Sequence, residues 1–174
     1  MNDYEILLDE ASKEGLIVKE KPLLANDGRI KGNKIAIRKD IATTDEKADV
    51  LAEELGHHYT TVGNIMDQSD AGNRKQELHA RMWGYNRRIG LQGLIDAYKH
   101  KCSNKYEIAE FLHVSEQELD DCIEAYREKY GTYIEYNGYI IYFLPNFYSP
   151  VRVSSIGNYS QLKVRPDYVI WRVE

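Results

Sequence analysis

The side chains most able to carry out chemistry lie together in one stretch, Glu53-Glu54-Leu55-Gly56-His57-His58. Residues four positions apart lie one turn apart on the same face of a helix. Glu53 and His57 are therefore placed to hold one metal ion, with Glu54 beside them. In an H-E-x-x-H helix the two histidines bind zinc and the glutamate takes a proton from water. Here Glu53 stands where that pattern has its first histidine, so the segment reads E-E-L-G-H.

A zinc site of this kind needs a third protein ligand. Glu77, twenty residues beyond His57, is the natural candidate. Ala80 and Gly84 share its helical face, and such small residues would let its helix approach the first one closely. His79 lies about 200° around the helix from Glu77 and is a poorer candidate.

Spacing alone leaves alternatives open. Glu54 and His58 have the same four-residue separation as Glu53 and His57, and a metal bound by them would leave Glu53 or no residue as the base. Adjacent glutamates are also common on a solvated helix face. E-x-x-x-H is a short motif, so it fits a metal site and a polar surface equally well.

Two helices must position these side chains. A capping-box pattern at Thr43 and Glu46 predicts a helix over about residues 45–61. Its apolar positions recur at helical spacing and should face the core: Ala48, Leu51, Leu55 and Tyr59. We expect Asn73 to cap the next helix. The core stripe of that helix should be Leu78, Met82, Tyr85 and Ile89.

The remaining pattern mixes helices with short strands, so we predict an α+β fold. Asp3 can cap a first helix. A hairpin should follow, with its turn at Gly32-Asn33 and its inward positions at Ile30, Ile35 and Ile37. A second hairpin should turn at Asn137-Gly138. Short strands are expected in the C-terminal segment, at "VRVSS", "QLKVR" and "YVIWRV".

Residues 105–126 resemble a helix-turn-helix, with the turn at His113-Val114-Ser115. Its second helix carries five acidic residues, Glu116, Glu118, Asp120, Asp121 and Glu124. Neutralisation of phosphates by basic side chains dominates affinity for DNA. A helix with this much negative charge would repel the phosphates, which argues against DNA recognition. We expect this segment to have a structural or partner-binding role, and we expect no specific binding of nucleic acid.

Composition bounds the class of protein. The 174 residues, 43% of them hydrophobic, suit one globular domain, and the net charge of -5 argues against a surface built to bind nucleic acid. Two cysteines, Cys102 and Cys122, make no disulfide framework and indicate a reducing compartment. The N-terminus lacks a signal-peptide pattern, and no apolar run is long enough to span a bilayer. We expect a soluble, cytoplasmic protein that does not associate with membranes.

The stretch "VLAEELGHHYTT…NRKQELHARMW" resembles the ImmA/IrrE family of metallo-endopeptidases, which is common in prophages and mobile elements. In that family "LAHELGH" carries the metal site, and a downstream E-L-x-A segment supplies a third ligand. The resemblance runs from the Ile30 hairpin to about Phe143. It implies a zincin-like helical core beside a small β-hairpin sheet. The peptidase-like domain would then span residues 1–144, followed by a β-rich extension over residues 145–174.

Carried over residue by residue, the resemblance makes His57 a zinc ligand, Glu77 the third ligand and Glu54 the general base. Glu53 falls where the family has its first ligand histidine. A carboxylate can bind zinc. A second carboxylate adds negative charge at the metal, which weakens its Lewis acidity and favours harder ions such as Mn²⁺.

The function that the resemblance implies is cleavage of a helix-turn-helix repressor of a phage or mobile element, which would derepress transcription. The alternative is a pseudoprotease that binds such a repressor without cutting it. A third hypothesis is a DNA-binding regulator acting through residues 106–125, against which the acidic surface argues.

Overall fold

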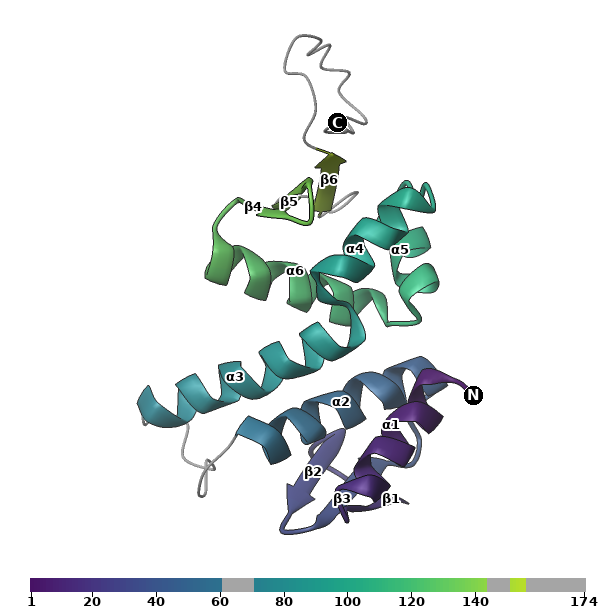
Figure 1. Ribbon diagram of the computed structural model, residues 1–174. Helices are drawn as coiled ribbons and strands as arrows, with labels where there is room; N and C mark the ends of the chain where they lie inside the picture. The colour runs from purple at the N-terminus through teal and green to yellow at the C-terminus, as the bar shows by residue number, and fades with distance from the viewer. Residues whose placement is uncertain (61–70, 144–150, 156–174) are drawn as a thin grey trace, which may run out of the picture. The chain divides into compact units, whose positions relative to one another are not determined.

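The structure, a computed structural model, describes residues 1–60, 71–143 and 151–155, with residues 71–73 and 151–155 described by their backbone alone (Figure 1). The described chain has an α+β fold, as the sequence predicted. It divides into two compact units. Unit 1 comprises Met1–Arg88 with His113–Ser115, and unit 2 comprises the rest of the chain. The domain boundary predicted at residue 144 falls outside the described residues.

The described residues of unit 1 form three helices and a three-stranded sheet. In chain order these are α1 (Asp3–Lys13), β1 (Ile17–Lys21), β2 (Gly28–Lys31), β3 (Lys34–Arg38), α2 (Thr44–Thr60) and α3 (Ala71–Arg88). The sheet order is β1-β3-β2, with β1 parallel and β2 antiparallel to β3. Figure 1 shows α1 and α2 lying against the sheet and α3 running along α2, so that α2 is the middle layer.

The predicted hairpin is confirmed. It joins β2 to β3 through a turn in which Gly32 has φ 59°, a conformation that glycine adopts without strain. Ile30 pairs with Ile35 across the hairpin. Because alternate residues of a strand point to the same face, Ile35 and Ile37 are both buried beneath the helices, and Ile30 packs partly buried against the same core.

The start of α2 is also as predicted. The Glu46 N–H donates to Thr43 Oγ1, and the Thr43 N–H donates to Glu46 Oε2, each over 3.1 Å. This reciprocal cap satisfies two donors that the first turn would leave unpaired. The inward face of α2 enters the core through Ala48, Leu51 and Leu55, none of which is measurably exposed.

The caps predicted for the other two helices of unit 1 are wrong. Asn2 caps α1, because its side chain accepts from the Glu5 N–H at 2.8 Å while Asp3 is already helical. Asn73 does not cap α3, since that helix begins at Ala71 and places Asn73 in its first turn. In each case a neighbouring residue could also take the capping position, and sequence pattern defines helix ends poorly.

Two predicted core positions are not buried. Leu78 is 42% exposed, because it lies two residues before Ala80, and Ala80 faces α2. Tyr59, at the end of α2, is 40% exposed and stacks on Trp83 with 4.8 Å between ring centroids. The rest of the predicted stripe is buried as expected, namely Met82, Tyr85 and Ile89.

Where the structure describes it, unit 2 combines three helices with an antiparallel meander. Its elements are α4 (Gly90–Lys99), α5 (Lys105–Leu112), α6 (Glu116–Tyr130), β4 (Tyr133–Tyr136), β5 (Tyr139–Phe143) and β6 (Val151–Ser155). The predicted turn between β4 and β5 is confirmed, with positive φ at both Asn137 and Gly138. The predicted helix pair is confirmed as α5 and α6, and "VRVSS" forms β6. The two last predicted strands lie outside the described residues.

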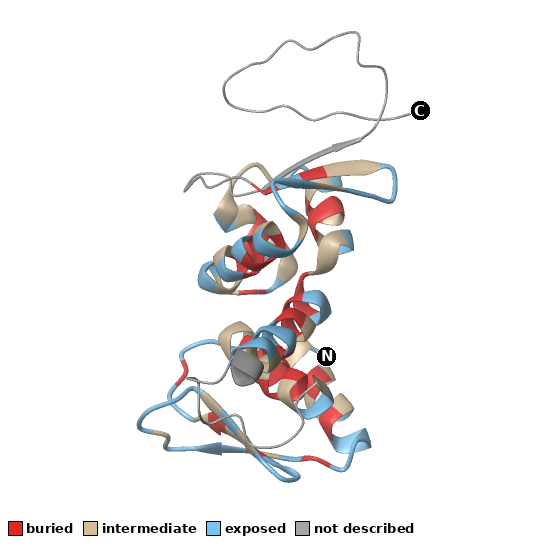
Figure 2. Cartoon of the chain, turned by 90° about the vertical axis from the view of Figure 1, so that its left-hand side faces the viewer, coloured by how far each residue is buried: buried red, intermediate tan, exposed pale blue. Residues whose placement is uncertain are grey.

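Each unit has its own buried interior. Figure 2 shows the buried positions running along the inner sides of the helices, with exposed positions on their outer turns. In unit 2 Tyr126 and Phe143 are fully buried and their rings lie 5.8 Å apart between centroids. Within residues 1–60 and 71–143, no helix is both long and apolar enough to cross a membrane.

A buried polar network in unit 1 centres on Arg88, the last residue of α3. Its side chain is 2% exposed, and its Nε lies 3.1 Å from Asp49 Oδ1. It also donates to the Asp3 carboxylate and to the His113 carbonyl oxygen. Asp49 in turn accepts from the Ser115 N–H at 3.0 Å. Burial raises the pKa of Asp49, and the Arg88 charge opposes that shift.

We expect Arg88→Met to lower the free energy of unfolding by about 3–5 kcal/mol, because it leaves the buried Asp49 without its cation. Arg87→Met is the matched control. Arg87 pairs with Glu10 at the surface, so its loss should cost less than about 1 kcal/mol. Urea unfolding of both variants measures the difference. Equal stabilities would contradict a structural role for the Arg88 network.

Candidate metal centre

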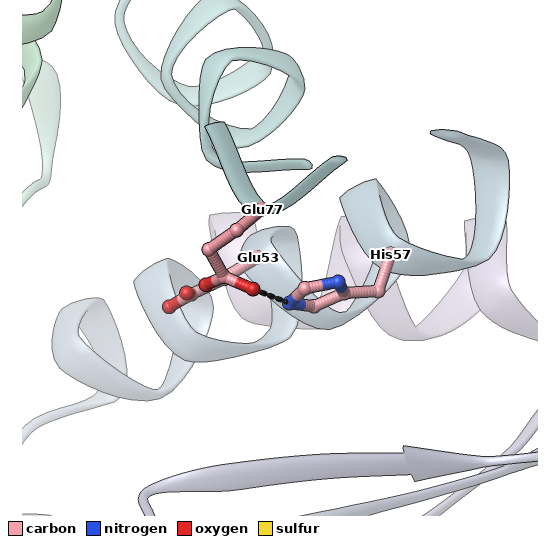
Figure 3. Close-up of side chains that lie close together, drawn as sticks. All are labelled: Glu53, His57 and Glu77. Carbon is pink, nitrogen blue, oxygen red and sulfur yellow. Dashed lines mark ion pairs between the residues drawn. The ribbon is translucent and has the colours of Figure 1, made fainter. Parts of the chain in front are cut away.

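The candidate centre begins on the side of α2 that turns away from the sheet. Glu53 and His57 lie one turn apart there, while Leu51 and Leu55 of the same helix enter the core. Glu77 approaches from α3 (Figure 3). The three side chains are partly buried, and their candidate ligand atoms all lie within 4.8 Å of one another.

This donor set fits a divalent cation. His57 Nε2 and Glu77 Oε2 are 3.6 Å apart, and two ligand atoms of a tetrahedral zinc site are separated by about 3.3–3.5 Å. The His57 and Glu77 side chains are 13% and 19% exposed, whereas Glu53 is 41% exposed. An imidazole with two carboxylates suits Zn²⁺ and also Mn²⁺. The structure thus brings together the three residues named as ligands from the sequence.

A close approach of α2 to α3 makes this convergence possible. A Cβ atom added to Gly56 would lie 2.2 Å from the Ala80 carbonyl oxygen, so only glycine fits there. A Cβ added to Gly84 would lie 3.4 Å from the Ala52 carbonyl carbon. The expectation that Ala80 and Gly84 allow close packing is supported. Gly56 was missed, although a glycine inside a helix costs about 1 kcal/mol relative to alanine and therefore signals a packing reason.

Glu54 lies about 100° around α2 from Glu53 and faces the hairpin, close enough to the centre for the charges of Glu53 and Glu77 to act on it. It is only 8% exposed, accepts a hydrogen bond from the Ile30 N–H, and its Oε1 would be 2.6 Å from a Cβ at Gly28. Burial, followed by the negative charge of Glu53, raises the pKa of Glu54 to about 8; Glu77 adds to the rise and the Ile30 N–H opposes it. With no metal ion at Glu53 and Glu77, Glu54 therefore favours its protonated form at neutral pH.

The other histidines near the centre lie outside it. His58 is exposed and packs edge-on against Tyr59. His79 is exposed as well, in keeping with its predicted position on a different face of α3. The alternative pair of Glu54 and His58 forms no group of three candidate ligands among the described residues.

Arg81 is the residue of the candidate centre that sequence reasoning missed. Its Nε lies 3.3 Å from Glu53 Oε1 and 3.3 Å from Glu77 Oε1, so one guanidinium contacts both carboxylates. The signal was present, because Arg81 follows Glu77 by four residues, a spacing at which opposite charges on a helix pair. Its contact with Glu53 depends on the packing of α3 on α2 and has no counterpart in local sequence.

Compared with models of known protein families and with curated proteins, the chain matches none of them. The resemblance to the ImmA/IrrE family thus rests on the motif residues themselves and stays a prediction.

Gly56→Ala should force α2 and α3 apart and so weaken both the fold and the centre. Overpacking of this kind typically costs about 1–3 kcal/mol. Gly84→Ala is the control on the same helix contact, where the added methyl meets ordinary van der Waals distances. Thermal unfolding and zinc titration should show lower stability and weaker zinc binding for Gly56→Ala, and little change for Gly84→Ala. A Gly56→Ala protein as stable as wild type would contradict the close contact.

We expect one divalent ion per chain, bound through His57. His57→Ala should remove it, whereas His58→Ala, one residue away and exposed, should retain it. Elemental analysis after dialysis against zinc measures both. A full equivalent of metal in His57→Ala would exclude His57 as a ligand.

Proposed function

We propose that this protein is a metal-dependent endopeptidase whose centre is formed by Glu53, His57 and Glu77, with Glu54 as its general base. The observation that carries the proposal is the convergence of three candidate ligands within 4.8 Å, next to a buried carboxyl group on the same helix. That combination of a ligand cluster and a neighbouring titratable group is typical of metal-assisted hydrolysis.

The ligands supply the cation's position and part of its electrostatic environment. His57 would bind through Nε2 and Glu77 through Oε2, the two atoms that lie 3.6 Å apart. A bound divalent ion would supply Lewis acidity toward water and a substrate carbonyl. The more exposed Glu53 side of the cluster is the side from which a substrate could reach it.

Glu54 has the properties of an acid–base group. The Ile30 N–H and the tight contact at Gly28 fix its side chain between α2 and β2. A general base works best when its pKa lies near the working pH, and burial brings this carboxyl group toward that range. A cation at Glu53 and Glu77 would offset the negative charges that help to raise the Glu54 pKa. Glu54 would then be ionised and able to accept a proton from water.

We propose a helix-turn-helix repressor as the substrate, on the basis of the family resemblance. One feature of unit 2 supports a basic partner. The outer side of α6 exposes acidic side chains at Glu116, Asp121, Glu124 and Glu128. Proteins that bind DNA carry basic surfaces, and opposite charges favour their encounter with an acidic face.

A pseudoprotease is the second candidate, and Glu53 is the observation that favours it. Two carboxylates at the cation reduce its Lewis acidity relative to a centre with two histidines. In that case the protein would bind the repressor and leave the chain of the repressor intact.

Glu54→Gln should distinguish an active endopeptidase from a pseudoprotease. Glutamine preserves size but cannot accept a proton, and loss of a general base typically lowers the rate about 10²–10⁴-fold. Cleavage of a repressor encoded nearby, followed by mass spectrometry, should fall by that factor while zinc and repressor binding persist. Glu14→Gln, an exposed change just after the end of α1, controls for loss of charge.

Cleavage by Glu54→Gln at the wild-type rate would eliminate the proposed mechanism. If wild type and Glu53→His both bind the repressor and neither cuts it, the pseudoprotease is the better account.

A further inference from the structure

The contact of Arg81 with both carboxylates has a defined geometry. Its Nε approaches the Oε1 atom of Glu53 and the Oε1 atom of Glu77. The other oxygen of Glu77, Oε2, is the one that faces His57. Arg81 therefore binds the side of the Glu77 carboxylate away from His57, and leaves Oε2 with His57 on the side where a cation would bind.

The charges of this arrangement explain why an arginine is useful there. A set of two histidines and one glutamate carries a charge of about -1, whereas Glu53, His57 and Glu77 with a neutral imidazole carry about -2. One guanidinium bonded to both carboxylates brings the total back to about -1. Arginine suits this role because it stays charged at any physiological pH and presents several donors in one plane.

Three other basic side chains of unit 1 pair elsewhere. Lys47 pairs with Glu20, Arg87 with Glu10, and Arg88 with Asp49, and none of these ion pairs includes Glu53, His57 or Glu77. Glu54, the remaining acidic neighbour, is turned toward β2. Among the ion pairs of the described residues, those of Arg81 alone join a cation to Glu53.

We propose that Arg81 is a positioning residue that compensates the charge of Glu53 at the metal centre. It stays paired with the Oε1 atoms of Glu53 and Glu77, and thereby limits metal affinity while preserving Lewis acidity. This rests on the proposed metal-dependent function. Glu53 and Arg81 then form a matched pair: the carboxylate stands in for a histidine ligand, and the guanidinium offsets the extra charge.

The test is metal affinity measured without substrate, by zinc titration against a competing chelator. Removing a positive charge a few ångström from a divalent ion should strengthen its binding, so Arg81→Gln should bind zinc about tenfold more tightly or better. Water screens part of this effect, because the Arg81 side chain is 52% exposed. Arg81→Lys keeps the charge and should stay within a few-fold of wild type. Arg87→Gln makes the same charge change elsewhere on α3 and should leave affinity unaltered.

Coupling to Glu53 makes the test specific. In a Glu53→His background the extra carboxylate is gone, so Arg81→Gln should change zinc affinity several-fold less than it does in wild type. Zinc binding by Arg81→Gln alone, with none by wild type, would also support the charge role.

Two results would overturn the inference. One is equal or weaker zinc binding by Arg81→Gln, with wild type still binding. The other is a change in zinc affinity on Arg81→Gln that is as large in the Glu53→His background as in wild type. Absence of zinc from both wild type and Arg81→Gln would contradict the proposed metal centre itself. That outcome is distinct from the two above, in which wild type binds zinc and only the role of Arg81 is contradicted.

Discussion

The close contact between α2 and α3 is the constraint on which the rest of the centre depends. Gly56 lies against the Ala80 carbonyl oxygen at a distance that excludes any side chain. That contact fixes the rotation and the separation of the two helices. Glu53 and His57 precede and follow Gly56 on one helix, and Glu77 and Arg81 flank Ala80 on the other. A single backbone approach thus aligns two candidate ligands from α2 with one candidate ligand and the Arg81 cation from α3. The hairpin completes the arrangement beside α2, where Gly28 and Ile30 hold Glu54.

Electrostatics explains how such a polar cluster is tolerated beside a core. The two carboxylates would repel each other if left alone, and both raise the pKa of the buried Glu54. Arg81 offsets that charge from the solvent side, and a divalent ion would offset it from the side of His57. Arg88 performs a comparable task elsewhere in unit 1, where it neutralises Asp49 and Asp3. Opposite charges from helices distant in sequence therefore recur in unit 1, buried at Arg88 and about half exposed at Arg81.

Features governed by local sequence were predictable. Helical spacing placed Glu53 on the same face as His57, the Thr43 box gave the start of α2, and Gly32 and Asn137 marked turns with positive φ. The convergence of Glu77 was inferred from small residues on its own helix face. Features that depend on contacts between elements were not predictable. The bridge from Arg81 to Glu53 needs the rotation of α3 on α2, and the burial of Glu54 needs the position of β2. Leu78 failed as a core residue because an apolar spacing does not by itself say which face of α3 meets α2.

The most direct test of the account is the position of a bound cation. Crystals of the protein soaked in zinc, with diffraction measured on both sides of the zinc absorption edge, locate the metal without any assumption about ligands. The account predicts one strong anomalous peak per chain, within about 2.0–2.2 Å of His57 Nε2 and of one oxygen each of Glu53 and Glu77. Arg81 should remain in contact with their other oxygens. A peak bound by other residues, or an empty site at saturating zinc with the three side chains still converging, would contradict it.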